Sequence, residues 1–318
     1  MKNGSDDYRY PYNTDIMENY KNPDVIIVGG SYAGLSAGMA LGRSLRRVLI
    51  IDSGMPCNRQ TPHSHNFITQ DGETPANIAQ KAKKQVLAYD TVQFLHDTVI
   101  AGKKIDESFQ IQTASGAIFT CKKLIFATGI KDIIPDIEGF AACWGISVIH
   151  CPYCHGYEAR DTKTGILANG DFAFHYAQLV HNLTKDITIF TNGKADFDRE
   201  QLEKLERHKI RIIEKKIALL DHREGRIEQV VFANGSSHAL ETMYARPDFV
   251  QHSLIPEDFG CELTEQGLLK TDFTQQTTVE GLFACGDNSN MMRSVAYAVA
   301  TGNIAGAVVN HQLSAAAF

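Results

Sequence analysis

The strongest constraint on the fold is a short glycine-containing segment, Gly29-Gly30-Ser31-Tyr32-Ala33-Gly34, that lies between two apolar runs. Residues 24–28 form the first run, residues 33–45 carry a helical pattern, and residues 48–51 form the second run, which ends at Asp52. Strand, tight turn, helix and strand in this order predict a βαβ unit with a parallel sheet. The sequence therefore predicts an α/β fold.

The same order of elements recurs about 139 residues later, counting Gly29 against Ala168. A strand over 165–168, a turn at Asn169-Gly170, a helix over 172–183 and a strand over 187–190 follow one another. We therefore expect two Rossmann-like domains, each a three-layer ββα dinucleotide-binding fold, with the second inserted into the first. The expected segments are a tail at 1–23, the first domain at 24–136, the inserted domain at 137–244, and the return of the first domain at 245–318.

Shorter sequence patterns predict a hairpin in each of the two domains. Residues 109–113 and 117–120 flank Ala114-Ser115-Gly116, which predicts a hairpin, and residues 124–126 form a buried strand that ends at Ala127-Thr128-Gly129. In the inserted domain a second hairpin is expected, with Asn234-Gly235 as its tight turn.

Composition excludes several classes of function. A chain of 318 residues exceeds one ordinary domain. A net charge of −6, with no block of Lys and Arg, argues against a nucleic-acid-binding protein. Residues 294–309 are the most apolar long stretch, but Thr301, Gly302 and Asn303 interrupt it, which favours a packed helix over a membrane span. Seven cysteines without a visible secretory leader favour a reducing, cytoplasmic compartment.

The first glycine turn has the features of a dinucleotide site. Gly29 permits the tight turn and Gly34 the close approach of helix and strand, although Ser31 replaces the middle glycine of the full pattern. Helix amides that start near Ser31 can face a pyrophosphate. Asp52, eighteen residues after Gly34, stands where a ribose hydroxyl needs an acceptor. The alternative is an ordinary glycine-rich turn.

The second turn keeps a single glycine, and the strand after it is followed by neither a carboxylate for a ribose 2′-hydroxyl nor an arginine pair for a 2′-phosphate. One interpretation is a nicotinamide dinucleotide site, and the other is a Rossmann scaffold that no longer binds one well. On the first interpretation the site consists of Asn169, Gly170, Asp171, Phe172, Ala173, Thr191 and Asn192.

Cys151-Pro152-Tyr153-Cys154-His155 lies between the two predicted nucleotide units. A structural zinc site needs about four ligands, and the sequence offers no second closely spaced pair, so no metal site is expected. A c-type haem attachment would need export, and a glutaredoxin-type domain places this motif after its first strand. The pattern favours a redox-active dithiol, with His155 supplying or accepting a proton.

The other cysteines and two histidines have simpler interpretations. The contexts of four cysteines predict buried structural thiols, whereas Cys57 lies in a polar loop and stays undecided. His63 and His65 are expected to be loop histidines, with a substrate or cofactor contact as the minor alternative. The four predicted buried thiols are Cys121, Cys143, Cys261 and Cys285.

Together with Ala127-Thr128-Gly129 and Gly281–Asp287, these motifs resemble those of the low-molecular-weight thioredoxin reductases over roughly residues 24–318. That family consists of FAD-dependent pyridine-nucleotide-disulfide oxidoreductases. The resemblance implies an oxidoreductase acting on a sulfur group, NADPH or NADH as donor, and a homodimer. It also implies a partner that is a thioredoxin-like protein or a small-molecule disulfide or dithiol.

The resemblance also implies roles for single residues. Cys154 would lie against the isoalloxazine, Cys151 would attack the partner disulfide, and His155 occupies the place of an acid aspartate. Asp287 would bind the ribityl chain of FAD, and residues 293–295 would begin a helix facing the flavin pyrimidine ring. The implied FAD-binding residues are Gly29, Ser31, Ala33, Gly34, Asp52, Ser53, Asn58, Arg59, Thr128, Gly129, Gly286, Asp287, Arg293, Ser294 and Val295.

The departures from the family leave the electron donor or acceptor open. The motif around Cys151 is closer to a branch that includes dithiol oxidases acting on gliotoxin and holomycin, which pass electrons to oxygen. Phe190-Thr191-Asn192-Gly193 stands where reductases carry a basic NADPH motif. A reductase, a dithiol oxidase, an enzyme fed by ferredoxin and a non-catalytic redox sensor therefore remain as alternatives. Residues 133–139 and 245–252 are the expected hinges for movement of the inserted domain.

Overall fold

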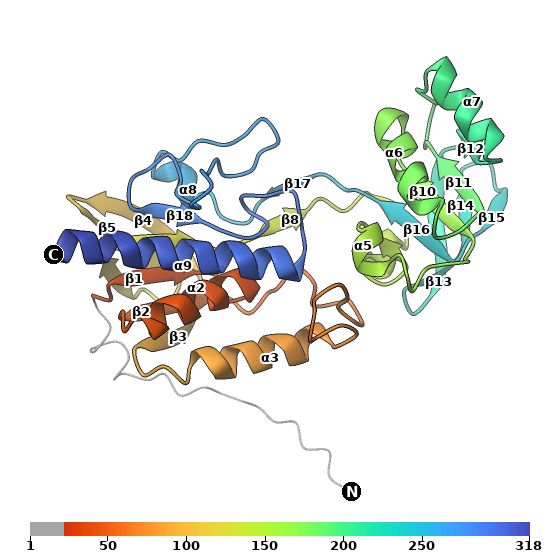
Figure 1. The fold of residues 1–318 in the computed structure, drawn as a ribbon. Coiled ribbons are helices and arrows are strands. Elements are labelled where there is room, and N and C mark those ends of the chain that lie inside the picture. The colour runs from red at the N-terminus through yellow and green to blue at the C-terminus, as the bar shows by residue number, and fades with distance from the viewer. Residues whose placement is uncertain (1–21) are drawn as a thin grey trace, which may run out of the picture. The chain divides into compact units, whose positions relative to one another are not determined.

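A computed structural model describes residues 22–318, which form two compact units (Figure 1). Unit 1 contains the described residues through Met55, together with Ala79–Gly129 and Gln251–Phe318. Unit 2 contains Pro56–Ile78 and Ile130–Val250. The fold is α/β with two Rossmann-like parallel sheets, as the sequence predicts. The predicted tail at 1–23 lies almost wholly outside the described residues, and the predicted boundaries at 136 and 244 stay predictions.

Unit 1 is built on a five-stranded parallel sheet. The predicted βαβ unit is present, because α2 (Tyr32–Arg43) joins the adjacent strands β1 and β2. β1 also pairs with β7 on its other side, so the strand order reverses direction next to β1. In spatial order the strands are β18 (Leu282–Ala284), β7 (Lys123–Phe126), β1 (Val25–Val28), β2 (Val48–Asp52) and β3 (Val92–His96).

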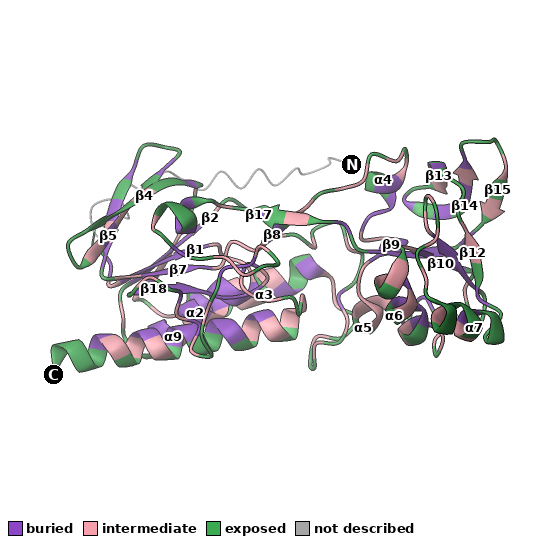
Figure 2. Ribbon diagram, turned by 90° about the horizontal axis from the view of Figure 1, so that it is seen from above, coloured by how far each residue is buried: buried purple, intermediate pink, exposed green. Residues whose placement is uncertain are grey.

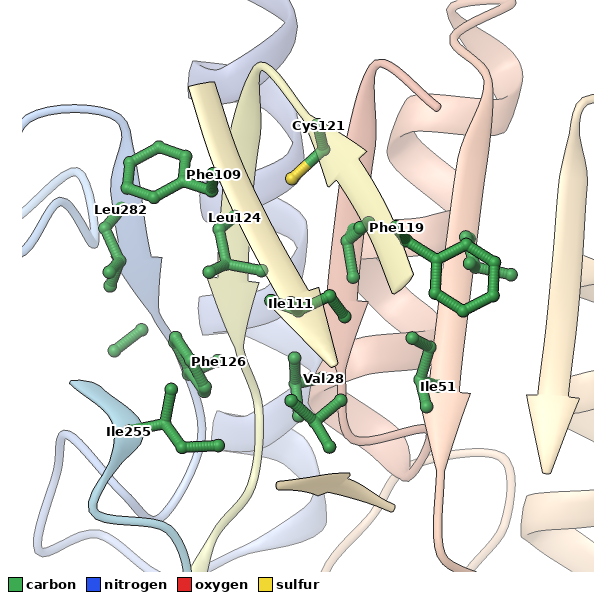
Figure 3. Packing of buried hydrophobic residues seen from close by; sticks show 14 of the residues in the cluster. Val28, Ile51, Phe109, Ile111, Phe119, Cys121, Leu124, Phe126, Ile255 and Leu282 are labelled. Carbon is green, nitrogen blue, oxygen red and sulfur yellow. The ribbon is translucent and has the colours of Figure 1, made fainter. Parts of the chain in front are cut away.

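A small antiparallel sheet of β4 (Val99–Ile105), β5 (Ser108–Thr113) and β6 (Ile118–Cys121) forms another layer of unit 1. The predicted hairpin is the β5–β6 pair. β4 carries no clear apolar alternation, and most of its residues are exposed, which explains why the sequence did not reveal it. Side chains of β5 and β6 pack with those of β7, β1 and β2 in one apolar cluster (Figure 3).

Unit 2 repeats this plan with a second five-stranded parallel sheet. The predicted strand–helix–strand unit is β10, α6 (Gly170–Val180) and β11, although the helix begins two residues earlier and ends three earlier than expected. Its helices also include α4 (Phe140–Cys143), α5 (Pro152–His155) and α7 (Arg199–Arg207). In spatial order the strands are β12 (Arg211–Ile213), β11 (Ile187–Phe190), β10 (Thr164–Leu167), β16 (Thr242–Ala245) and β9 (Val148–Ile149).

The antiparallel sheet of unit 2 contains β13 (Ile217–Arg223), β14 (Arg226–Phe232) and β15 (Ser237–Ala239). The predicted hairpin around Asn234-Gly235 is the β14–β15 pair, but its turn is longer than the expected tight turn. Phe232 N donates to Ser236 O, which leaves a loop at 233–235 with Gly235 at φ +80°. This arrangement is typical of a three-residue hairpin loop that ends in a left-handed glycine.

The chain passes between the units through a two-stranded pairing of β8 (Ile130–Asp132) and β17 (Phe249–Gln251). α3 (Pro75–Val86) and α8 (Ile255–Asp258) complete the helices of residues 22–318 apart from the C-terminal one. Figure 2 shows the central strands of both parallel sheets in purple, which marks them as buried. The unit boundary at Gly129 precedes one expected hinge, and that at Val250 falls inside the other; hinge motion itself stays a prediction.

The C-terminal helix α9 (Val295–Ala317) packs on α2 through small residues. A Cβ on Gly302 would lie 2.1 Å from Ala33 O, so the two backbones touch at this position. The predicted packed helix is therefore confirmed. Among residues 22–318, no helix combines the length and apolar character that crossing a bilayer requires. The four thiols predicted to be buried are buried, and Cys57 is exposed.

Candidate active site

The dinucleotide-binding residues predicted for unit 1 meet at one edge of its parallel sheet. The β1 turn starts at Gly29, β7 is followed by Thr128, and β18 is followed by Gly286-Asp287. The register pairs Val28 with Phe126, and the same parallel pairing brings all these strand ends to one edge. Ligands of open α/β sheets bind at the carboxyl ends of the strands where the strand order reverses, which here is between β1 and β7.

The turn after β1 can be built only with glycine at two positions. Gly29 has φ +105°, and a Cβ on Gly34 would lie 1.8 Å from Gly29 O. α2 starts directly afterwards with Ser31 as its N-cap residue, yet the Ser31 side chain makes no capping hydrogen bond, and the first turn carries no acidic residue. The positive end of this helix dipole is therefore not satisfied by the cap side chain and is suited to an anion.

Asp52, at the end of β2, borders this turn. Its carboxylate accepts hydrogen bonds from Gly30 N at 2.6 Å and Gly54 N at 2.7 Å. Lys83 Nζ lies 3.4 Å from the centroid of the Phe94 ring. Burial lowers the pKa of Lys83, and the nearby charge of Asp52 opposes that shift. A carboxylate at the end of β2 fits the predicted ribose acceptor.

The segment from Gly286 to Val295 forms the other side of the site. A Cβ on Gly286 would lie 3.1 Å from Ala33 Cβ, so this segment approaches α2 closely. Asp287 and Arg293 form an ion pair at 3.7 Å, and both side chains are largely buried. Ser294 caps α9, since its side chain accepts a hydrogen bond from Tyr297 N at 3.1 Å, and Val295 is the first helical residue.

Asn288 is a site residue that the sequence analysis missed. It is fully buried, and its Nδ2 donates to Phe126 O at 2.9 Å and lies 3.4 Å from Thr128 Oγ1. It thereby ties the loop after β18 to the loop after β7. The one available signal was an amide residue directly after Gly286-Asp287.

These residues fit FAD, the cofactor that the resemblance implies. A glycine turn that excludes any Cβ and a helix start without a side-chain cap suit a diphosphate, and a second capped helix begins at the same sheet edge. Ser53 is exposed next to Asp52, and Gly129 has φ +65°. Asn58 and Arg59 are the exceptions among the predicted residues, because by their contacts they belong to unit 2.

The equivalent turn of unit 2 is closed by its own side chains. Asn169 Oδ1 accepts hydrogen bonds from Gly170 N at 3.0 Å and Asp196 N at 2.9 Å, and Asn169 Nδ2 donates to Lys194 O at 2.9 Å. A Cβ on Gly170 would lie 3.2 Å from Asp196 O. The loop at 194–196 therefore lies against the start of α6, where a pyrophosphate would have to bind.

The remaining polar groups predicted for a nicotinamide site also bond within unit 2. Asp171 accepts from Gln201 Nε2 at 2.7 Å, Asn192 accepts from Ile217 N at 2.8 Å, and the Thr191 hydroxyl donates to Gly193 O at 2.6 Å. Asp171 also places a negative charge in the first turn of α6. The Arg246 guanidinium carbon lies 5.0 Å from the centroid of the Phe172 ring, and Ala173 is buried.

Cys151 and Cys154 lie where β9 ends at the carboxyl edge of the unit 2 sheet. Cys151 is the N-cap residue of α5, and Pro152 takes the first helical position, where its missing N–H costs nothing. Cys154 N and His155 N both donate to Cys151 O at 3.2 Å. Both cysteines are half-buried and lie in one helical turn. Spacing i to i+3 puts their side chains on one face of that turn.

Two tyrosines lie close to the Cys151–Cys154 pair. The Tyr176 hydroxyl donates to His150 O, directly before Cys151. Tyr244 is 1% exposed, and within residues 22–318 its hydroxyl has no hydrogen-bond partner. Burial, followed by the charges of Cys151, Tyr176 and Glu158, raises the pKa of Tyr244. Nothing in the sequence around Tyr244 indicated its position near Cys151.

His155 faces charged groups from two segments. Burial lowers the pKa of His155, a charge on His65 lowers it further, and Glu158 opposes both effects. His65 Nδ1 lies 3.5 Å from Glu158 Oε1 and 3.7 Å from Asp71 Oδ1. His63 Nδ1, by contrast, lies 3.0 Å from Gly72 O within the same loop. Of the two loop histidines, His65 is thus the one at the dithiol. In the described part of the chain, no three His, Cys, Asp or Glu residues are grouped to hold a metal ion.

Comparisons with known proteins agree with this arrangement. The sequence model of the pyridine nucleotide-disulphide oxidoreductase family matches residues 23–302. The thioredoxin reductase tcpT of Claviceps purpurea is 32% identical over 306 residues, which is 92% of this chain and 94% of that protein. A crystal structure of an oxidoreductase from Agrobacterium tumefaciens is 36% identical with a TM-score of 0.86, covering 92% of this chain and 99% of its own. The putative thioredoxin reductase TrxB from Bacillus anthracis is 28% identical with a TM-score of 0.88, covering 93% and 100%.

Proposed function

The chain belongs to the pyridine nucleotide-disulphide oxidoreductases and is an FAD-dependent thiol–disulfide oxidoreductase, and on this premise we propose that Cys151 and Cys154 carry electrons between the flavin and a partner disulfide. The observation that carries the proposal is the pair of half-buried cysteines in one helical turn beside His155. FAD, when bound, supplies a two-electron centre that can exchange with this pair.

The residue steps follow thiol–disulfide exchange. The Cys151 thiolate attacks one sulfur of the partner disulfide, and the partner's other sulfur leaves as a thiolate. Cys154 then attacks the Cys151 sulfur of this mixed disulfide and releases the second partner thiolate. The partner gains two electrons, Cys151 and Cys154 lose them and become a disulfide, and His155 holds or delivers the proton that the leaving sulfur takes up.

We assign FAD binding to the predicted residues of unit 1 that meet at the carboxyl edge of its sheet. The amides after Ser31 would face the diphosphate, Asp52 the adenosine ribose, and Asp287 the ribityl chain. The start of α9 would contact the flavin ring. The Asp287–Arg293 ion pair supports this assignment because it holds Asp287 in a largely buried position.

Single-cysteine variants test the two thiol roles. With Cys154→Ser, Cys151 should form a stable mixed disulfide with thioredoxin or with 5-thio-2-nitrobenzoate, because no resolving thiol is present. With Cys151→Ser, no adduct should form at Cys154, while the flavin content stays that of the parent protein; peptide mapping distinguishes these positions from the exposed Cys57, which can react in both variants. Trapping by Cys154 instead of Cys151 would reverse the assignment, and trapping by neither would reject the dithiol.

A second candidate concerns the direction of electron flow. The closed turn at Asn169 favours a donor other than NADPH or NADH, because the loop at 194–196 and the Asp171 carboxylate compete with a pyrophosphate. On this alternative the enzyme oxidises a small-molecule dithiol and passes the electrons to oxygen, or it receives them from a donor such as ferredoxin.

An anaerobic titration with NADPH and with NADH, followed by flavin absorbance, separates the candidates. Bleaching at stoichiometric nicotinamide supports the reductase. Absence of bleaching, combined with peroxide formation when a dithiol is added in air, supports the oxidase. If reduced ferredoxin bleaches the flavin absorbance and neither nicotinamide does, ferredoxin is the electron donor.

The partner, the assembly and the compartment belong to the same proposal. A thioredoxin-like protein or a small-molecule disulfide or dithiol fits the half-buried, accessible Cys151. The four buried cysteines, which form no disulfide, fit a reducing compartment, so we place the protein in the cytoplasm, as a homodimer like the family it resembles. Light scattering on the eluting protein checks the dimer: a mass near 70 kDa, about twice the 35.2 kDa of one chain, supports it, and 35.2 kDa rejects it.

A further inference from the structure

The loop that carries His65 belongs to unit 2 and has a defined structure next to the dithiol helix. Ser64 N donates to Glu73 O at 2.8 Å, and Gly72 N donates to Ser64 O at 2.9 Å, so the segment between Ser64 and Gly72 is closed at its base. Asn66 N donates to Asp71 Oδ1 at 2.7 Å, which orients Asp71 within the loop. These bonds fix the position from which His65 reaches Glu158, in the turn that follows α5.

Glu158 is the residue that His65 reaches. The two side chains approach to 3.5 Å, and the side chain of His65 is only 19% exposed. Ala159 N donates to His155 O at 3.1 Å, so His155 and Glu158 lie in the same helical turn, three residues apart. The Glu158 carboxylate thereby interacts with two imidazoles, that of His155 in its own turn and that of His65 from the loop.

We propose that Glu158 and His65 are opposed positioning residues for His155, which together set how readily it holds a proton beside the Cys151–Cys154 pair. Glu158 favours the charged imidazolium, and a positive charge on His65 disfavours it. Burial of His155 favours the neutral form and lowers the pKa of His155, and Glu158 opposes that effect. This inference rests on the proposed role of His155 in thiol–disulfide exchange.

The groups that face this cluster come from several elements. His155 faces Glu158 on its own turn and His65 on the loop, and Asp71 lies behind His65 at 3.7 Å. Tyr244, on β16, faces both Glu158 and Cys151 with a neutral hydroxyl. The balance at His155 is therefore one carboxylate against one imidazole, with Asp71 holding that imidazole in place.

The test is a titration of His155 in the intact, reduced enzyme labelled with ¹³C at histidine Cε1. The His155 signal is identified by its loss in His155→Asn. Glu158→Gln should lower the pKa of His155 by about one unit, and His65→Asn should raise it by a similar amount. His63→Asn is the matched control: its ring lies 6.4 Å from that of His65, but its Nδ1 contacts the Gly72 carbonyl and not Glu158, so it should shift the titration far less than His65→Asn.

A merely structural role would not shift the two titrations in opposite directions. Shifts of the same sign in Glu158→Gln and His65→Asn, or no shift in either, would overturn the inference. Circular dichroism verifies that each variant is folded; Glu158 is 44% exposed, so its substitution leaves no buried charge.

Kinetics separate this inference from the proposed function. The pH–rate profile for reduction of a disulfide, or oxidation of a dithiol, should move with the measured pKa of His155 in both variants. If His155→Asn leaves that profile unchanged, His155 is not the proton carrier, whatever the titrations show. If His155→Asn changes the profile but Glu158→Gln and His65→Asn do not, the proposed function stands and the inference fails.

Discussion

The two Rossmann turns of this chain follow the same plan and differ in what occupies the helix start. In unit 1 Ser31 precedes α2 and makes no side-chain capping bond. In unit 2 Asn169 precedes α6, caps it, and also holds the loop at 194–196 with two further hydrogen bonds. The amide groups at the start of α2 remain available to a ligand, whereas Asn169 and the loop at 194–196 cover the start of α6. The two turns therefore differ in one cap residue and its neighbouring loop, although they share one fold.

The largest effect is expected at the turn after β1, called the open turn because Ser31 makes no side-chain capping bond there; the substitution tests how little space this turn has. Gly34→Ala would place a Cβ 1.8 Å from the Gly29 carbonyl oxygen, a backbone atom that cannot move aside. We expect a loss of more than about 3 kcal/mol in unfolding free energy and purification without flavin. The matched change, Gly170→Ala, meets Asp196 O at 3.2 Å and should cost only about 1–2 kcal/mol for its positive φ. Thermal melting measures the stability of both variants, and flavin absorbance measures their flavin content. Equal losses of stability in Gly34→Ala and Gly170→Ala would contradict the comparison.

The next effect compares the two cap residues directly. Asn169→Ala removes two accepted hydrogen bonds and one donated bond, so it should lower the unfolding free energy by about 2 kcal/mol. Ser31→Ala removes no capping bond and should cost less than about 0.5 kcal/mol. Urea unfolding of each variant gives the two values. If Ser31→Ala were the more costly substitution, Ser31 would have to act as a cap in the folded protein.

A third change tries to convert the open turn into a closed one. Ser31→Asp supplies a cap acceptor and a negative charge at the start of α2, which should stabilise the apoprotein by about 0.5–1 kcal/mol. The same charge should weaken FAD binding at least tenfold, about 1.4 kcal/mol, because it repels the diphosphate. Titration of apoprotein with FAD, followed by flavin fluorescence, measures the dissociation constant. Ser31→Asn is the neutral control, and unchanged affinity in Ser31→Asp would place the diphosphate elsewhere.

The smallest effect appears at alkaline pH, in the core that supports the open turn. Burial raises the pKa of Cys121 and of Cys285 to about 12 from 9.0, and both lie in unit 1. Because the folded pKa exceeds the unfolded one, each thiol's contribution is complete below pH 9 and is lost as the pH rises toward 12. At pH 10 the loss should be about 1 kcal/mol per thiol.

Denaturant unfolding at pH 8 and pH 10 measures this alkaline loss. Cys285→Ala should show a smaller decrease between the two pH values than the parent protein, even though the substitution itself costs some packing energy. Cys57→Ala changes an exposed thiol and serves as the control. An equal decrease in the parent and Cys285→Ala would show that the buried thiols do not govern alkaline stability.

Local signals predicted much of the fold. The apolar runs at 24–28 and 48–51 and the glycines between them gave β1, α2 and β2, because the chain itself fixes strand length and turn geometry. β4 was missed, since most of its side chains face solvent and leave no apolar alternation. The Asn234-Gly235 hairpin was predicted correctly as a hairpin but with too short a turn, because the bond from Phe232 N to Ser236 O sets the loop length.

The candidate site also contains residues that the sequence revealed and residues that it did not. Cys151, Cys154 and His155 are close in sequence, and their chemistry was visible there. His65 and Tyr244 are 90 and 89 residues from His155, and neither stands in a recognisable motif. Their places beside the dithiol follow from the closed loop at Ser64 and from the pairing of Tyr244 with Ile149 on β9.

By itself, the sequence determined the two parallel-sheet units, the glycine turn after β1 and the Cys151–Cys154 motif, because each depends on residues within one or two turns of chain. Tertiary structure alone decided that the second turn is closed, since Asn169 meets Asp196 and Lys194 only after β10, α6 and β11 have packed. It also decided which charges surround His155. Hydrogen bonds and electrostatic interactions depend on distance in space, and separation along the chain does not specify that distance.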